Sequence, residues 1–286
     1  MSEQPTEHDP QDERDQLKAD LLELALEAAR RAGVLLAEGR PADLGVAATK
    51  SSPIDVVTEM DIAAEKLITG YLSEHRPGDT FLAEEGSLGS DDGTSPRARD
   101  SGVRWVIDPL DGTVNYLYGL PSWAVSIAAE YEGSRLVGVV EVPSRGETYR
   151  AVLGHGAFLN ARPISCRGEV GLEEALVGTG FNYVHERRRA QAEVAHRLIP
   201  RVRDIRRSGS AALDLCDVAA GRLDAFYERG LNAWDYAAGE LIAREAGALT
   251  GGRPGAEVGP ELALAASPGA FTQLQPLLEE LGAWHD

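Results

Sequence analysis

The sequence is poor in cysteine and in long apolar segments. Of its 286 residues only two are cysteines, Cys166 and Cys216, and they lack the spacing of a metal-binding motif. So few cysteines in a long chain argue against a disulfide scaffold and favour reduced thiols in a cytoplasmic protein. No signal-peptide segment opens the chain, and no apolar run approaches the ~18 residues that suggest a membrane helix.

Basic residues are also scarce. Lys and Arg total 28 against 46 Asp and Glu, which gives a net charge of −18. Binding along a nucleic-acid backbone needs a basic face, so this excess argues against a nucleic-acid-binding protein and against one held on anionic membranes. An acidic enzyme that acts on a phosphate ester must screen the repulsion locally, which bound cations would do. We interpret the short basic runs Glu186–Arg189 and Arg206–Arg207 as solvated charges rather than as a substrate or partner patch.

Hydrophobic residues make up 43% of the chain, which is enough for a sizeable core. Composition and periodicity predict three parts: a disordered acidic tail (1–15), an N-terminal α+β half (16–162) and a C-terminal α/β half (163–286). Strands expected between 123 and 152 form an antiparallel meander, whereas strands and helices alternate after residue 162. This change indicates two layered halves that share a cleft. The polar stretch 87–102 is expected to be a mobile or gating loop.

Carboxylates gather where predicted strands and helices begin or end. Asp108 and Asp111 follow the predicted strand 103–107, and Pro109 and Gly112 shape a turn there. Both carboxylates can therefore converge on one point, where a cation must offset their repulsion. Hard divalent cations such as Mg²⁺ prefer oxygen ligands of this kind. The pair could equally be a turn whose Asp and Gly serve backbone geometry.

Three further acidic residues stand at similar positions. Glu84 follows the predicted strand 80–83, Asp235 precedes the predicted helix 236–246, and Asp61 lies near the start of the predicted helix 59–75. Each has a structural alternative: Glu84 could be an exposed turn residue, Asp235 an N-cap, and Thr58-x-x-Asp61 a capping box. We expect the capping box to form and to hold the Asp61 carboxylate rigidly as well.

The motifs around these residues resemble those of one family. The segment Asp108–Tyr116 is similar to the pattern Asp-Pro-[Ile/Leu]-Asp-Gly-Thr-x-Asn-[Phe/Tyr], and Trp234–Gly239 to Trp-Asp-x-Ala-[Ala/Gly]-Gly. Other similar segments follow in the same order along the chain: Lys50–Thr58, Glu84–Gly86, Gly154–Asn160, Gly209–Ala212 and Gly221–Glu228. Together they resemble the inositol monophosphatase family of Mg²⁺-dependent, lithium-sensitive phosphatases, in particular its bacterial SuhB-type branch.

The resemblance implies a fold and a set of metal ligands. The fold would be a layered α/β protein, the five-layer αβαβα sandwich of the inositol monophosphatase and fructose-1,6-bisphosphatase type. A first Mg²⁺ would be held by Glu84, Asp108 and the carbonyl of Leu110, and a second by Asp108, Asp111 and Asp235. A third, weaker ion would rest mostly on Glu84 and water.

The resemblance also assigns the residues that handle water and substrate. Thr113, hydrogen-bonded to Asp61, would orient and help to deprotonate a metal-activated water that attacks the phosphorus directly. The backbone N–H groups of Gly112 and Thr113 would receive the phosphate. Residues that meet the hydroxyls of the alcohol would be Asp111, Ala211, Glu228 and Asp235. Lys50 and Asp55 would lie at the edge of the site, on a loop.

The resemblance predicts hydrolysis of myo-inositol 1-phosphate by a homodimer. The same chemistry could act on histidinol phosphate, fructose 1,6-bisphosphate, NADP or 3′-phosphoadenosine 5′-phosphate. A third alternative is a phosphatase-like regulatory or binding protein without activity. The presence of every expected metal carboxylate argues against that alternative, and Glu228 favours a polyol, because a carboxylate accepts hydrogen bonds from hydroxyls.

Overall fold

The computed structural model describes residues 10–41, 44–50, 56–86 and 101–285. Asp55, residues 1–9 and most of the polar stretch 87–102 therefore lie outside the described residues. Helices are α1 (Pro10–Glu38), α2 (Glu59–His75), α3 (Thr113–Leu117), α4 (His185–Leu198), α5 (Ala211–Ala219), α6 (Ala233–Glu245) and α7 (Pro268–Glu280). Strands are β1 (Ala48–Thr49), β2 (Val56–Val57), β3 (Thr80–Ala83), β4 (Val103–Asp111), β5 (Ala124–Tyr131), β6 (Ser134–Val142), β7 (Glu147–Val152), β8 (Ala157–Leu159), β9 (Arg162–Ile164), β10 (Leu176–Thr179), β11 (Asp204–Arg206), β12 (Ala225–Glu228), β13 (Leu249–Gly251) and β14 (Ala263–Ala266).

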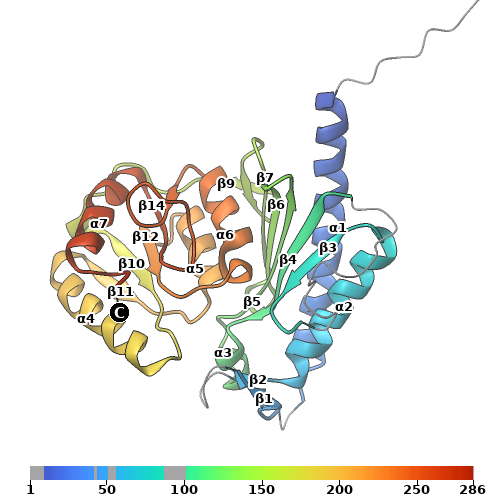
Figure 1. Ribbon diagram of the computed structural model, residues 1–286, viewed down its shortest axis with the longest axis horizontal. Coiled ribbons are helices and arrows are strands. Elements are labelled where there is room, and N and C mark those ends of the chain that lie inside the picture. The colour runs from blue at the N-terminus through green and yellow to red at the C-terminus, as the bar shows by residue number, and fades with distance from the viewer. Residues whose placement is uncertain (1–9, 42–43, 51–55, 87–100, 286) are drawn as a thin grey trace, which may run out of the picture.

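These elements stack in five layers (Figure 1). Helices α1 and α2 cover the outer face of a seven-stranded sheet with the order β3-β4-β5-β6-β7-β8-β9. Helices α5 and α6 form the middle layer, and a five-stranded sheet with the order β11-β10-β12-β14-β13 follows. Helices α4 and α7 lie on its far side. This arrangement is the αβαβα sandwich that the family resemblance implied.

The seven-stranded sheet contains the expected meander. Strands β4 to β9 pair in sequence and antiparallel, and only β3 joins β4 in parallel. The described chain also contains short strands that the sequence analysis did not predict: β1, β2, β8, β9 and β13. Strands of two or three residues are too short to establish an alternating pattern of hydrophobicity.

The first helix starts earlier than expected. Residues 10–15 were assigned to a disordered tail, but α1 already begins at Pro10, and this part of the assignment is wrong. Proline is compatible with the first helical position, and Asp12 and Glu13 are well placed in the first turn, near the positive end of the helix dipole. Further along, Leu21, Ala28, Ala32 and Leu36 are fully buried against the sheet.

The middle helices pack against both sheets in one continuous core. This core joins β5 and β6 on one side, β12 and β14 on the other, and α5 and α6 between them. Close contact is possible because β6 carries Gly138, where an added Cβ would lie 2.8 Å from the Ala238 carbonyl of α6. The expected boundary at residue 162 falls inside β9, the last strand of the larger sheet, and the division into two halves stays a prediction.

Candidate active site

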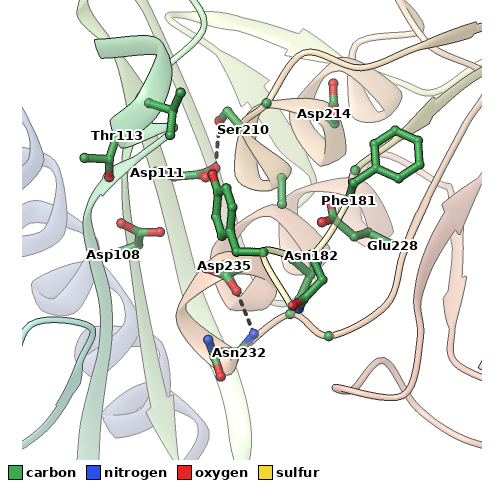
Figure 2. A pocket seen from close by; sticks show the side chains of 18 of the residues that line it. Asp108, Asp111, Thr113, Phe181, Asn182, Ser210, Asp214, Glu228, Asn232 and Asp235 are labelled. Carbon is green, nitrogen blue, oxygen red and sulfur yellow. Dashed lines mark hydrogen bonds between the residues drawn. The ribbon is translucent and has the colours of Figure 1, made fainter. Parts of the chain in front are cut away.

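A bulge at the end of β4 turns two aspartates toward one side. Asp108 pairs with Ser126 and Asp111 with Ala124, so β4 uses three steps where β5 uses two. Such an extra residue re-aims the side chains that flank it, which would otherwise alternate between the faces of the sheet. Between them, Leu110 is buried in the core behind the sheet. Figure 2 shows Asp108 and Asp111 facing the same space.

Gly112 ends the strand and begins the single-turn helix α3. Its φ of 94° is left-handed, and an added Cβ would lie 2.8 Å from the Ser122 carbonyl. Only glycine meets both conditions without strain. Thr113, the first residue of α3, therefore lies beside the two aspartates, and its Oγ1 is 2.9 Å from Asp61 Oδ1 and 3.1 Å from the Leu110 carbonyl.

Asp61 is held rigidly by the predicted capping box at the start of α2. Its Oδ2 accepts hydrogen bonds from the Thr58 backbone N–H at 2.8 Å and from the Thr58 hydroxyl at 2.5 Å. Asp61 is completely buried. Burial raises its pKa, and the hydrogen bonds from Thr58 and Thr113 oppose this shift. The cap therefore positions one carboxylate oxygen, Oδ1, against the Thr113 hydroxyl.

The C-terminal part of the chain supplies the opposite wall. Asp235 stands in the first turn of α6, and its Oδ2 accepts the Asn232 backbone N–H at 2.6 Å. Asn232 is the N-cap, so Asp235 is the second member of a capping box and the alternative that it is the N-cap itself is wrong. Figure 2 shows Asp235 across from Asp108.

Asp111 connects the two walls. Its Oδ2 accepts the Ser210 hydroxyl and the Ala212 backbone N–H, both at 2.7 Å, from the start of α5. Ser210 is also the N-cap of α5 and accepts the Leu213 N–H. One serine thus caps the helix and fixes the orientation of Asp111.

Glu84 enters the site just after β3, with its backbone N–H bonded to the Ile107 carbonyl at 3.3 Å. Lys50 lies 2.7 Å from Glu84 Oε1 and 2.5 Å from Glu85 Oε1. Burial opposes the charge of Lys50, but Glu84 and Glu85 outweigh it and raise the pKa of the ammonium. Burial raises the pKa of Glu85 to about 7, although Lys50 opposes the shift. The ammonium therefore offsets negative charge at this end.

The clustered carboxylates repel one another. Burial first, and then the charges of Glu84, Asp111 and Asp235, raise the pKa of Asp108 well above its usual range. Burial followed by the charges of Glu84 and Asp111 does the same to Asp235, and burial raises the pKa of Asp111 to about 6. Such mutual repulsion disfavours the ionised forms, and a bound cation would restore them.

The donor set fits a hard cation. In the described part of the chain, no three Asp, Glu, His or Cys side chains already enclose a common point. Each predicted aspartate ligand nevertheless has one oxygen fixed by a backbone N–H, from Leu110 to Asp108, from Ala212 to Asp111 and from Asn232 to Asp235. The second oxygen of each carboxylate remains for a cation, and all donors are oxygen, as Mg²⁺ prefers.

The predicted metal ligands and Thr113 line one cavity of about 410 Å³. Every described residue that the sequence analysis assigned to metal or substrate lines it, as does Lys50. Asp61, which was assigned to hold Thr113, lies behind that residue, and Asp55 lies outside the described residues. Glu228 lies on the wall formed by the C-terminal part, over Gly180, where an added Cβ would overlap its carboxylate. Burial raises the pKa of Glu228 to about 8, with Arg207 opposing the shift.

Some residues of the cavity escaped the sequence analysis. They include Asp214, Arg187, Arg207 and the segment Phe181–Val184. Asp214 is almost fully buried inside α5, so its sequence neighbours gave no sign that it faces a cavity. The histidines His75, His155, His185 and His196, which were assigned no role in metal binding, do not line the cavity.

Comparison with known proteins agrees with this geometry. The model of the inositol monophosphatase family matches residues 17–280. The inositol-1-monophosphatase SuhB of Mycobacterium tuberculosis is 43% identical over 94% of this chain and 96% of its own. The Nus factor SuhB of Pasteurella multocida is 42% identical over 80% of this chain and 84% of its own. The crystal structure of the extragenic suppressor protein SuhB from Bartonella henselae superposes with a TM-score of 0.81 at 35% identity, covering 91% and 99% of the two chains. The chain therefore belongs to the inositol monophosphatase family.

Proposed function

We propose that this protein is a Mg²⁺-dependent phosphomonoesterase that hydrolyses myo-inositol 1-phosphate and related inositol monophosphates. One observation carries the proposal: carboxylates from three separate segments line one cavity, next to a threonine held by a buried aspartate. Glu84, Asp108, the Leu110 carbonyl, Asp111 and Asp235 are the residues that would hold Mg²⁺. When bound, the ions supply positive charge to the phosphate and make water a better nucleophile.

Thr113 is proposed to orient the attacking water. Its hydroxyl has one proton, which it donates to Asp61 Oδ1 at 2.9 Å or to the Leu110 carbonyl at 3.1 Å. When the proton points to Asp61, a lone pair of Oγ1 is left to accept a hydrogen bond from water, and a proton taken from that water would be balanced by transfer of the Thr113 proton to Asp61 Oδ1. Asp61 is buried and fixed by Thr58, so this acceptor oxygen is in position before substrate arrives.

The protein contributes mainly position and charge. Phosphoryl transfer needs little covalent chemistry from an enzyme, and no histidine or cysteine lines the described cavity as a nucleophile. We therefore infer direct attack of water rather than a covalent intermediate. The N–H groups of Gly112 and Thr113 are proposed to receive the phosphate, and Asp111, Ala211, Glu228 and Asp235 the hydroxyls of the alcohol.

The identity of the substrate is tested by phosphate release. The panel contains inositol 1-phosphate, histidinol phosphate, fructose 1,6-bisphosphate, NADP and 3′-phosphoadenosine 5′-phosphate, each with and without Mg²⁺. We expect the highest kcat/KM among the monophosphates for inositol 1-phosphate, and no turnover without a divalent cation. A higher kcat/KM for histidinol phosphate would reject the proposed substrate.

The alternative is a regulatory or binding protein without catalytic activity. The name of the Pasteurella relative, Nus factor SuhB, is a reason to test this alternative. The complete set of acidic ligands supports the enzymatic proposal, because a protein retained only for binding has no need of them. Absence of phosphate release from every substrate in the panel, with Mg²⁺ and a folded protein, would favour the alternative.

A further inference from the structure

Asp214 is a buried carboxyl in the cavity, and the proposed function gives it no role. It is 3% exposed and belongs to α5, yet it lines the same cavity as the predicted metal ligands. Ala211, which is proposed to meet a hydroxyl of the alcohol, precedes it by three residues and also lines the cavity. Residues three apart lie on one face of a helix. Asp214 therefore extends the proposed hydroxyl-binding face of α5 by one helical turn.

Two glycines of the five-stranded sheet leave space for this carboxyl and for that of Glu228. At Gly178 in β10, an added Cβ would lie 3.5 Å from Asp214 Cγ. At Gly180, which directly follows β10, an added Cβ would overlap the Glu228 carboxylate. Glycine in a strand is typical of places where another group approaches the backbone closely. Both carboxyls therefore rest on the same short segment of chain.

Both carboxyls also lie on the side of the sheet that faces α5. Glu228 is two residues from Phe226 in β12, so their side chains point to the same face, and Phe226 packs in the core shared with α5. A strand rises about 3.3 Å per residue, so the positions of Gly178 and Gly180 are roughly 6–7 Å apart. At this spacing, the carboxyls of Asp214 and Glu228 can contact different hydroxyls of one small polyol.

The carboxyl of Asp214 has bonding capacity left for a ligand. It forms no ion pair within the described part of the chain, and the Ser208 side chain is its hydrogen-bonding neighbour. Burial raises the pKa of Asp214 well above its usual range, and Ser208 opposes this shift. Three charges add to the shift: those of Asp217, Glu228 and Asp111. A protonated carboxyl can donate one hydrogen bond and accept others, and a hydroxyl of a substrate can serve as either partner.

We propose that Asp214 determines substrate specificity together with Glu228, by binding a second hydroxyl group of the alcohol. Figure 2 shows both on the side of the cavity away from Asp108, so the phosphate would lie at the predicted cation site and the alcohol beside the two carboxyls. An alcohol without these hydroxyls would displace water from Asp214 and Glu228 without replacing its hydrogen bonds, which weakens binding. The inference rests on the proposed function and names its substrate class, which is phosphate monoesters of polyols with at least two further hydroxyls.

The experiment measures kcat/KM with Mg²⁺ for inositol 1-phosphate and for 4-nitrophenyl phosphate, whose ring carries no hydroxyls. If 4-nitrophenyl phosphate is not cleaved, its inhibition constant replaces kcat/KM. The first variant is Asp214→Leu, which has nearly the same shape and forms no hydrogen bonds, and Asp214→Ala repeats the test if leucine is too large beside Gly178. We expect the preference for inositol 1-phosphate to fall about tenfold in either variant, as for loss of one hydrogen bond in a buried site. Asp214→Asn keeps a donor and an acceptor and should retain most of the preference.

Asp217→Asn is the matched control. Asp217 is 9% exposed on the same helix, pairs with Arg145 and Arg222 at 3.3 Å, and does not line the cavity. This variant should keep the wild-type preference for inositol 1-phosphate.

An unchanged preference in Asp214→Leu and Asp214→Ala would overturn the inference, as would an equal fall in Asp217→Asn, which would indicate only a disturbed helix. Both results leave the proposed function intact if the wild type hydrolyses inositol 1-phosphate. No phosphate release from inositol 1-phosphate by the folded wild type with Mg²⁺ would refute the proposed function and the inference with it.

Discussion

Replacing Asp108 with asparagine should abolish turnover and leave the fold intact. Asp108 is 1% exposed, and its Oδ1 accepts the Leu110 N–H at 3.0 Å. An asparagine Oδ1 can accept the same hydrogen bond in the same space. What Asp108→Asn removes is negative charge at the one residue proposed to bind both Mg²⁺ ions, so both would be held more weakly.

The size of the effect follows from this shared role. Removing a single electrostatic donor from an active site costs roughly 10²–10³ in kcat. A ligand shared by two cations should exceed this, and we expect kcat to fall by more than about 10³, which corresponds to about 4 kcal/mol. Phosphate release from inositol 1-phosphate under saturating substrate measures it.

The stability of the variant provides a second, independent readout. Burial and the charges of Glu84, Asp111 and Asp235 already raise the pKa of Asp108, so the cation-free fold gains by losing this charge. Without Mg²⁺, the Tm of Asp108→Asn should equal or exceed that of the wild type. The increase in Tm on adding Mg²⁺ should shrink, because it depends on the ratio of ion concentration to Kd.

Glu141→Gln is the matched control. This carboxyl is also partly buried with a raised pKa, but it accepts a hydrogen bond from Thr148 and does not line the cavity. Its kcat and its response to Mg²⁺ should match the wild type. If Asp108→Asn keeps more than about a tenth of the wild-type kcat, a loss of ~1.4 kcal/mol or less, the two-cation assignment is wrong.

Four further predictions follow from the same site. Thr113→Val should lower kcat about 10²-fold or more, as for loss of a proton-transfer group, whereas Thr113→Ser should keep most of the activity. Both variants should keep the rise in Tm with Mg²⁺. A valine variant with wild-type activity would exclude a role of the Thr113 hydroxyl in orienting water. The pKa of Asp111 is raised to about 6 in the fold against 3.8 ordinarily, so its contribution to stability is complete below about pH 4 and is lost as pH rises through 6. Without divalent cations, the free energy of unfolding should therefore fall across this range. A flat pH profile in chemical denaturation would contradict this prediction. Lithium should inhibit at millimolar levels or below with limiting Mg²⁺, because the family resemblance implies that Li⁺ replaces the more weakly held ion and traps phosphate; full activity at high millimolar Li⁺ would count against it. Light scattering at micromolar concentration should give the mass of a homodimer, and a monomeric mass would reject that proposal.

Local sequence signals predicted the parts of the site that depend on local structure. The pattern Thr58-x-x-Asp61 predicted the capping box at the start of α2, and the pair Asp108 and Asp111 indicated where β4 ends. These residues act through neighbours only a few positions away, so spacing and residue type suffice. The bulge between the two aspartates was not predictable, because it depends on pairing with β5.

The remainder of the cavity depends on long-range packing. Arg187 and Arg207 belong to different segments, and their sequence neighbours are solvated, so nothing local distinguishes them from Arg188 or Arg206. Asp214 lies within a buried helix whose cavity-facing side is decided by the sheets on either side. The start of α1 was missed for a simpler reason, because its first turns are polar and show no apolar periodicity.

The central claim is that Asp108 joins two cations in this cavity. The most direct test is a crystal structure of the wild type with Mn²⁺ and phosphate, in which anomalous scattering locates each ion. We expect two peaks roughly 3.5–4 Å apart, one near Glu84 and one near Asp235, with Asp108 between them and phosphate beside Thr113. A single peak, or ions bound without Asp108, would contradict the account.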